Sequence, residues 1–272
     1  MKNQGLGIFF YLLYLLAMVS PLMPIIEYHA NFNYIATKLC ENKDRPYLEC
    51  NGKCYLQKQL KQTKMEFKVC GITNINQAEA ISSQGAQFIG FIFYPSSKRY
   101  ALSSLSLEDI AAFKPTNTKK VGVFVNETTE KLIDIATKAG LDMIQLHGDE
   151  DASYCATIQA AFPVIKVFRV SKTIPDFALF ENVASYYLFD TDSALYGGTG
   201  QHFNWEIIKK TRFNKPFFLS GGIGINDVHG IQVLKAANAG KDLMAVDLNS
   251  KFETSPGNKN IELIKTFINE FI

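Results

Sequence analysis

The sequence predicts an α/β protein, a (β/α)8 TIM barrel preceded by a hydrophobic helix and a short cysteine-containing linker. From Phe67 onward, short apolar runs alternate with longer segments of helical periodicity. The runs are continuously apolar, as expected of strands buried on both faces of a parallel sheet. Eight units leave about 26 residues for each, near the lower limit for such a barrel. The eight expected strands are 67–70, 88–93, 121–125, 143–146, 164–168, 186–189, 217–219 and 243–246.

Amphipathic segments separate these runs and predict eight helices. Asn74, with Gln77 three residues later, forms a capping-box-like start for the first helix. Further helices are expected over 129–139 and 260–271, the latter with its apolar residues on one stripe. An open, doubly wound sheet would carry G-x-G-x-x-G after its first strand. The first turn here is instead Cys-Gly-Ile-Thr (70–73), which favours the barrel.

Composition excludes some classes of function. The chain has 272 residues, of which 47% are hydrophobic and 20% charged, enough for one large domain with a sizeable core. The net charge of +2, without basic runs interleaved with aromatic residues, predicts no nucleic-acid partner. Five cysteines are too few for a disulfide scaffold. The sequence leaves the oligomeric state open.

Residues 1–64 are expected to form an extension separate from the barrel domain, 65–272. Residues 5–26 carry no charge and would span about 33 Å as a helix, enough to cross a bilayer. The segment is longer than a signal-peptide core and lacks a small-x-small cleavage site, so a membrane anchor is predicted. Because a chain begun at Met65 would still contain the whole barrel, the extension could be a fusion or the product of an upstream start. The flanking lysines leave the orientation open.

Three of the cysteines lie in this extension. Cys40, Cys50 and Cys54 could supply metal ligands together with His29, and the Cys-x3-Cys spacing is acceptable for a metal. The same thiols could equally form one disulfide and leave one thiol over. This pattern is too irregular to predict a metal, and no metal or cofactor is expected.

The candidate catalytic residues follow two strands of the barrel. Cys70 ends the first strand and Asp190 follows the sixth. Active sites of barrels lie at the C-terminal ends of the strands, so both side chains are expected to face one cavity. A base and an acid on separate strands suit proton-transfer chemistry. The alternatives are a buried structural thiol and a capping aspartate.

Two loops predict a phosphorylated small-molecule substrate. Gly221 and Gly222 follow the seventh strand, and Asp247, Asn249 and Ser250 follow the eighth. Small residues let backbone N–H groups approach an anion, and barrels often bind phosphate between these two loops. A glycine pair alone is commonly just a turn.

Four further residues are expected at the same mouth. Arg99 follows the second strand and could bind a carboxylate through its planar fork. Gln145 and His147 lie on one side of the fourth strand by alternation. The glycine-rich segment 196–200, which includes Gly198, could close over the cavity as a lid.

Together these residues resemble the phosphoribosylanthranilate isomerases, single-barrel enzymes of tryptophan biosynthesis. The resemblance covers the chain from about Met65 to the C-terminus, and residues 1–64 have no counterpart in it. The matching stretches are KVCGITN (68–74), GFIFYPSSKRY (90–100), VGVFVN (121–126), QLHGDE (145–150), LFDTDSALYGGTGQHFNW (188–205), LSGGI (219–223) and AVDLNSKFE (245–253).

The resemblance implies an Amadori rearrangement of N-(5-phosphoribosyl)anthranilate to 1-(2-carboxyphenylamino)-1-deoxyribulose 5-phosphate, without a cofactor. By position, Asp190 matches the general acid, Cys70 the general base and Arg99 the residue that binds the anthranilate carboxylate. Gly222 and the segment 249–251 lie in the phosphate loops of the family. The family often has Ser-Ser-Gly where this chain has Asn-Ser-Lys.

The sequence leaves two other interpretations open. A related phosphosugar isomerase of the histidine pathway would use two aspartates, and Cys70 argues against it. A membrane-tethered binding or metal-handling protein with a scaffold barrel would not need both phosphate loops. Because the substrate is cytoplasmic and a thiol base needs reducing conditions, the barrel is expected in the cytoplasm, at the inner face of the membrane. A cationic mouth is expected to make the Cys70 thiolate accessible near neutral pH.

Overall fold

The structure is a computed structural model that describes residues 23–45, 48–56, 65–192, 202–237, 240 and 242–271. The chain divides into two compact units, Met1–Lys64 and Met65–Ile272.

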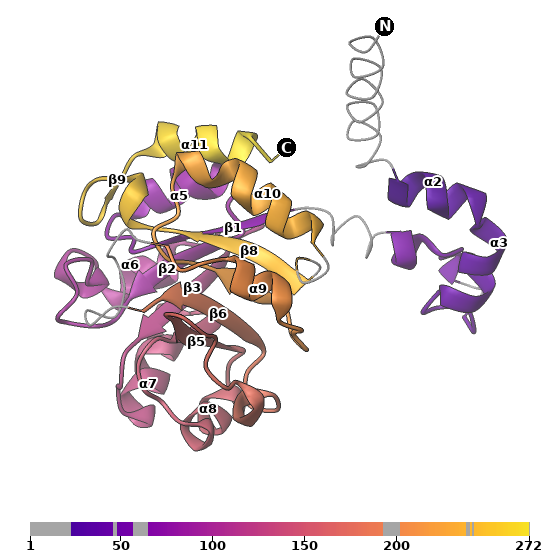
Figure 1. Ribbon diagram of the computed structural model, residues 1–272. Helices are drawn as coiled ribbons and strands as arrows, with labels where there is room; N and C mark the ends of the chain where they lie inside the picture. Colours follow the sequence, from indigo (N-terminus) through magenta and orange to yellow (C-terminus); the bar gives the residue numbers. More distant parts are fainter. Residues whose placement is uncertain are drawn as a thin grey trace, which may run out of the picture. The chain divides into compact units, whose positions relative to one another are not determined.

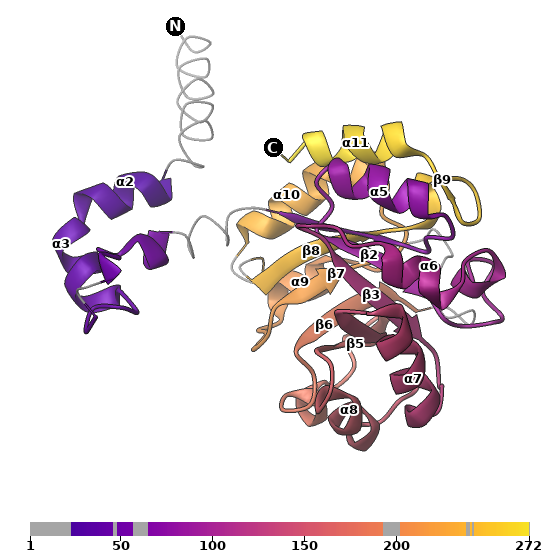
Figure 2. The same cartoon turned by 180° about the vertical axis from the view of Figure 1, so that it is seen from behind.

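The second unit is a closed barrel of eight parallel strands, which confirms the predicted fold (Figures 1 and 2). The strands follow one another around the barrel in chain order, and β1 pairs with β8 to close it. Every predicted strand overlaps one observed strand. Their bounds are β1 (Glu66–Cys70), β2 (Phe88–Ile92), β3 (Lys119–Phe124), β4 (Met143–Leu146), β5 (Val164–Val170), β6 (Tyr186–Thr191), β7 (Phe217–Leu219) and β8 (Leu243–Leu248).

Helices lie outside the strands and begin at recognisable caps (Figure 1). The side chain of Asn74 accepts a hydrogen bond from the Gln77 backbone N–H at 3.3 Å, so the first helix starts where the sequence predicted. The helix over 129–139 is also observed with those bounds. The helices of the barrel are α5 (Ile75–Ser83), α6 (Leu107–Ala112), α7 (Thr129–Ala139), α8 (Ala152–Gln159), α9 (Glu206–Lys210), α10 (Val228–Ala236) and α11 (Ile261–Asn269).

One expected helix is replaced. Between β5 and β6, a segment described in full, only the 3-10 turn η5 (Ala178–Phe180) forms. Pro175 lacks the backbone N–H that a helix interior needs, which shortens the stretch available for a helix. Phe177 and Phe180 pack on Phe168 of β5, with ring centroids 6.3 and 5.4 Å apart, and cover the strand in place of a helix.

The barrel has two apolar layers, which explains why the strands are continuously apolar. Alternate side chains point into the barrel and form a small cluster of Phe88, Val121, Met143, Ile165, Val167, Leu188, Phe218 and Ala245. The other side chains pack outward against the helices in a much larger cluster. The inner cluster fills the barrel and forms the floor beneath the polar groups at the strand ends.

The described part of the first unit contains short helical elements. They include α2 (Met23–Ala30), α3 (Phe32–Tyr34) and the π-helix η2 (Ile35–Leu39), and residues 53–56 are also helical. Most of the predicted membrane segment 5–26 lies outside the described residues, since only its last four residues belong to α2. Within the described ranges, no helix has the length and apolar character that a membrane crossing requires.

Candidate active site

A cavity of about 350 Å³ opens at the C-terminal ends of the strands. Gly198 lies outside the described residues. The other predicted site residues all line this cavity: Cys70, Arg99, Gln145, His147, Asp190, Gly221, Gly222, Asp247, Asn249 and Ser250. Apolar walls come from Ile92, Val123, Val125 and Ile223, so polar groups converge in a partly apolar pocket, as is usual for small-molecule sites.

Cys70 is the last residue of β1 and is only 4% exposed. It pairs in register with Gly90 of β2. A Cβ atom at Gly90 would lie 2.8 Å from the Cys70 sulfur, so the absent side chain makes the space that the thiol occupies.

The environment of Cys70 differs from the one expected. Burial raises the pKa of the Cys70 thiol, and the ammonium groups of Lys68 and Lys259 only partly oppose this effect. The cationic mouth is therefore present, but desolvation outweighs it. The thiol is the favoured form near neutral pH when the cavity is without substrate.

Beside Cys70 lies a buried ion pair that sequence analysis did not identify. Lys68 precedes Cys70 by two residues and so points to the same side of β1. Its Nζ lies 2.9 Å from Oδ1 of Asp247 in β8, and both side chains are at most 5% exposed. Although burial alone would lower it, Asp247 and Cys70 hold the pKa of Lys68 above its ordinary value. Burial raises the pKa of Asp247 itself, and Lys68 only partly opposes that rise. With a separation of 2.9 Å and the raised pKa of Lys68, Asp247 holds a cation next to the thiol.

Asp190 is held on the other side of the mouth, within β6. Its Oδ1 accepts a hydrogen bond of 2.9 Å from the backbone N–H of Thr191, and its Oδ2 lies 3.2 Å from Nε2 of His147. Nε2 of Gln145 lies 2.9 Å from Nδ1 of the same ring. With the amide donating to Nδ1, a neutral His147 carries its proton on Nε2, which is buried and makes no hydrogen bond although Asp190 Oδ2 lies 3.2 Å away. The Gln145 Oε1 atom is buried and has no hydrogen-bond partner in the structure.

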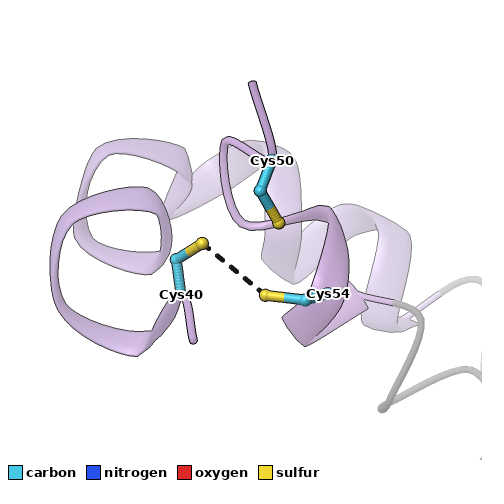
Figure 3. A group of neighbouring side chains, drawn as sticks. All are labelled: Cys40, Cys50 and Cys54. Carbon is cyan, nitrogen blue, oxygen red and sulfur yellow. Dashed lines mark hydrogen bonds between the residues drawn. The ribbon is translucent and has the colours of Figure 1, made fainter. Parts of the chain in front are cut away.

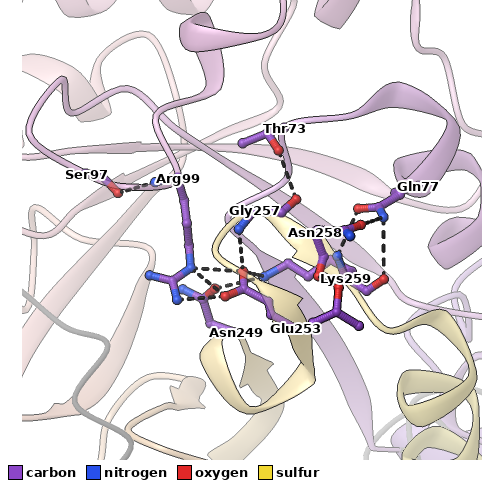
Figure 4. A network of polar contacts seen from close by, with 10 residues as sticks. Thr73, Gln77, Ser97, Arg99, Asn249, Glu253, Gly257, Asn258 and Lys259 are labelled. Carbon is purple, nitrogen blue, oxygen red and sulfur yellow. Dashed lines mark hydrogen bonds and ion pairs between the residues drawn. The ribbon is translucent and has the colours of Figure 1, made fainter.

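Arg99 is fixed by a second group of charges (Figure 4). Its Nε lies 2.9 Å from both carboxylate oxygens of Glu253, and its Nη2 lies 2.7 Å from Oε2. Lys259 Nζ bonds to the same carboxylate at 2.6 Å and to Asn249 Oδ1 at 2.9 Å. Although burial alone would raise it, the two cations hold the pKa of Glu253 below its ordinary value. This network joins the loop after β2 to the hairpin after β8.

Glu253 and Lys259 were not singled out from the sequence. They are cross-strand partners in a hairpin of β9 (Glu253–Ser255) and β10 (Asn258–Lys259). The Pro-Gly dipeptide at 256–257 is a strong turn signal that could have located this hairpin. Its pairing with Arg99, 154 residues away, has no comparable local signal.

The two loops predicted to bind phosphate both line the cavity. Gly221 and Gly222 both have positive φ, 95° and 66°, which a side chain would strain. Ser250 opens the 3-10 turn η8 (Ser250–Phe252) after β8. These loops bring small residues and backbone amides into the lining of the cavity that also contains the ion-paired Arg99.

Comparison with known proteins identifies the family to which this barrel belongs. Residues 67–270 match the family model for N-(5'phosphoribosyl)anthranilate (PRA) isomerase. The N-(5'-phosphoribosyl)anthranilate isomerase of Aquifex aeolicus is 39% identical over 75% of this chain and 97% of its own length. That of Phocaeicola vulgatus is 37% identical over 76% of this chain and 97% of its own length.

A solved structure of the Thermotoga maritima enzyme superimposes with a TM-score of 0.63, at 35% identity, over 76% of this chain and 98% of that one. Residues 1–64 lie outside the family match. The chain therefore belongs to the N-(5'-phosphoribosyl)anthranilate isomerase family.

Proposed function

We propose that residues 65–272 form an isomerase domain that catalyses the Amadori rearrangement of N-(5-phosphoribosyl)anthranilate, with Cys70 as general base and Asp190 as general acid. The observation that carries this proposal is the placement of both groups in the lining of one cavity, on β1 and β6. These strands are not neighbours in the barrel, so a sugar can lie between the two side chains.

The proton transfers follow from this placement. Asp190 gives a proton to the furanose ring oxygen as the C1–O bond breaks, and the anthranilate nitrogen supplies the electron pair that forms the Schiff base. The Cys70 thiolate then removes the proton from C2, which leaves an enolamine. The enolamine then gains a proton at C1 while its C2 hydroxyl loses one, which gives the ketone. The two protons gained and the two lost in the sequence balance. No redox partner is required, because electrons move only within the substrate.

The remaining groups supply binding. Arg99 presents a guanidinium held by Glu253, which suits the planar carboxylate of anthranilate. The loops with Gly222, Asn249 and Ser250 offer small residues for the 5-phosphate. A solved relative, 32% identical with a TM-score of 0.58, is described as a complex with reduced 1-(o-carboxyphenylamino)-1-deoxyribulose 5-phosphate. That ligand carries both a carboxylate and a phosphate.

Two variants test the catalytic roles. Cys70→Ala and Asp190→Asn should each lower kcat by about 10²–10⁴-fold, the usual contribution of a general acid or base. Loss of anthranilate fluorescence reports turnover. Cys155→Ala is the matched control, because Cys155 is a buried thiol on α8 and does not line the cavity. Near-normal turnover of either catalytic variant would refute its role.

We also propose that residues 5–26 anchor the chain with the barrel on the cytoplasmic side. The support is the uncharged sequence of this segment and the need of a thiol base for reducing conditions. In intact cells, added protease should leave the barrel uncut. Release of the full-length chain by carbonate washing would contradict the anchor.

A further inference from the structure

The three cysteines of the first unit converge on one point (Figure 3). Cys40 ends the π-helix η2, while Cys50 and Cys54 lie on either side of a tight turn. All three sulfur atoms lie within 4.8 Å of one another, and Cys54 Sγ hydrogen-bonds to Cys40 Sγ at 3.6 Å. The group contains no carboxylate or imidazole. His29 is exposed and not part of it, contrary to one possibility considered from the sequence.

Local backbone structure brings these thiols together. Asn51 and Gly52 both have positive φ, 48° and 81°, which turns the chain between the two cysteines. A Cβ atom at Gly52 would lie 2.8 Å from Cγ2 of Ile35, so the turn packs closely on the start of η2. The Tyr28 hydroxyl donates to the Asn51 carbonyl at 2.9 Å and fixes the turn from α2. These contacts therefore hold the backbone around the three cysteines in one conformation.

Hydrogen-bond donors surround the sulfurs. The backbone N–H of Glu41 donates to Cys54 Sγ at 3.4 Å. The Cys54 backbone and the Asn42 side chain also hydrogen-bond to Cys50. Such donors stabilise thiolates, the form in which cysteine binds a metal.

We propose that Cys40, Cys50 and Cys54 form a three-coordinate thiolate site for a soft metal ion, Cu(I). With metal–sulfur bonds of about 2.3 Å, a planar three-sulfur site places its sulfurs roughly 4.0 Å apart. The observed separations, from 3.6 Å to at most 4.8 Å, bracket this value. A disulfide would require about 2.05 Å.

The donor set selects the ion. Thiolates prefer soft ions such as Cu(I) and Zn(II). Structural zinc sites are almost always tetrahedral with four protein ligands, and the described part of this unit brings three together. Cu(I) is satisfied by three sulfurs. Cys40 is buried while Cys50 and Cys54 are partly exposed, so the site is open to solvent on one side, as exchange of the ion requires.

The compartment favours the metal over a disulfide. Residues 57–64, between the cluster and the barrel, read QKQLKQTK and are too polar to cross a bilayer. The three thiols therefore share a compartment with the barrel. This step alone depends on the cytoplasmic placement proposed above, because a reducing compartment keeps thiols free.

The test is a Cu(I) titration of the full chain in detergent under a phosphine reductant, with bicinchoninate as the competing chelator. We expect one Cu(I) per chain and three sulfur neighbours in X-ray absorption. Cys40→Ser and Cys54→Ser should each weaken binding at least about 100-fold. His29→Ala and Cys155→Ala should leave it unchanged, since neither residue is in the cluster. Cys50→His keeps a ligand atom at its position and should retain measurable binding, which separates loss of a ligand from unfolding.

Several results would overturn the proposal. They are no retained Cu(I), equal retention in the serine variants, tighter binding of Zn(II) than of Cu(I), or a Cys40–Cys54 disulfide in protein prepared anaerobically with reductant. The serine variants should keep full isomerase activity, because the cluster belongs to the other unit. Failure of the isomerase proposal would therefore leave the titration interpretable.

Discussion

Gly90→Ala should separate the geometry of the proposed base from the stability of the barrel. Gly90 pairs with Cys70 across β1 and β2. An added Cβ would lie 2.8 Å from the Cys70 sulfur, 3.1 Å from its Cα and 3.3 Å from its Cβ. Two of these three contacts are with the backbone and its first side-chain carbon, which cannot rotate away. The sulfur is the atom that must move.

The size of the effect follows from these distances. Ordinary contacts between heavy atoms are about 3.5–4.0 Å, so the sulfur must retreat by about 1 Å. A misplacement of about 1 Å can cost about 10²-fold in rate. Overpacking a filled core typically costs about 1–3 kcal/mol, which lowers the Tm of a domain of this size by several degrees. We expect kcat to fall about 100-fold while the protein remains folded at 25 °C.

The assay combines steady-state kinetics at 25 °C with thermal unfolding. Gly122→Ala is the matched control, because Gly122 lies on the adjacent strand β3 but faces outward. Its added Cβ would clash with Leu141 and would lie 2.8 Å from Phe124, in the layer between the strands and the helices. It should lower the Tm and leave kcat near the wild-type value. A Gly90→Ala enzyme with wild-type kcat, or equal rate losses in both variants, would refute the reasoning.

Three further outcomes are expected. Lys68→Met leaves the buried carboxylate of Asp247 without its counter-ion, so the free energy of unfolding in urea should fall by about 3–5 kcal/mol. A loss below about 1 kcal/mol would contradict an ionised pair. Because burial raises the pKa of Cys70, kcat/KM should still be rising with pH at about pH 9, above the ordinary thiol pKa of about 8.5; a plateau by pH 8 would show an activated thiolate instead. Arg99→Lys loses the fork aligned by Glu253, so KM should rise about tenfold, or ~1.4 kcal/mol, with kcat nearly unchanged; a matching fall in kcat would assign Arg99 to the chemical step.

The fold was predictable because each strand is buried on both faces. Val121 and Phe124 of β3, for example, are both fully buried, one against the inner cluster and the other against the outer layer. The predicted ends of the strands were less accurate. β5 continues to Val170, beyond the predicted end at Phe168, because Arg169 and Val170 pair in register with β6. The charged Arg169 interrupts the apolar run on which the predicted end relied, although Val170 is buried in the core. The helix expected before β6 was also mispredicted, because Phe177 and Phe180 cover β5 there in place of a helix.

The placement of the site residues was predictable for a topological reason. Parallel strands that close into a barrel bring all their C-terminal ends to one rim, so a residue at a strand end is placed without knowledge of its neighbours. What surrounds each residue was not predictable. The Lys68–Asp247 pair spans 179 positions, and no local pattern states which distant charges will meet. The environment of Cys70 was mispredicted for this reason, because burial and three charged neighbours together decide its pKa.

The raised pKa of Cys70 is compatible with its proposed role as a base. A weaker acid is a stronger conjugate base, so burial increases the driving force for removing the C2 proton while it reduces the fraction of thiolate present. The Lys68 cation limits that reduction, and Asp247 keeps the cation in place within the apolar barrel. Removing Asp247 alone would leave the buried Lys68 without its counter-charge, so burial would lower the Lys68 pKa and weaken the cation that limits the loss of thiolate. In the proposed mechanism the Lys68–Asp247 ion pair, of which Asp247 lines the cavity, thus helps to set the strength of the neighbouring base.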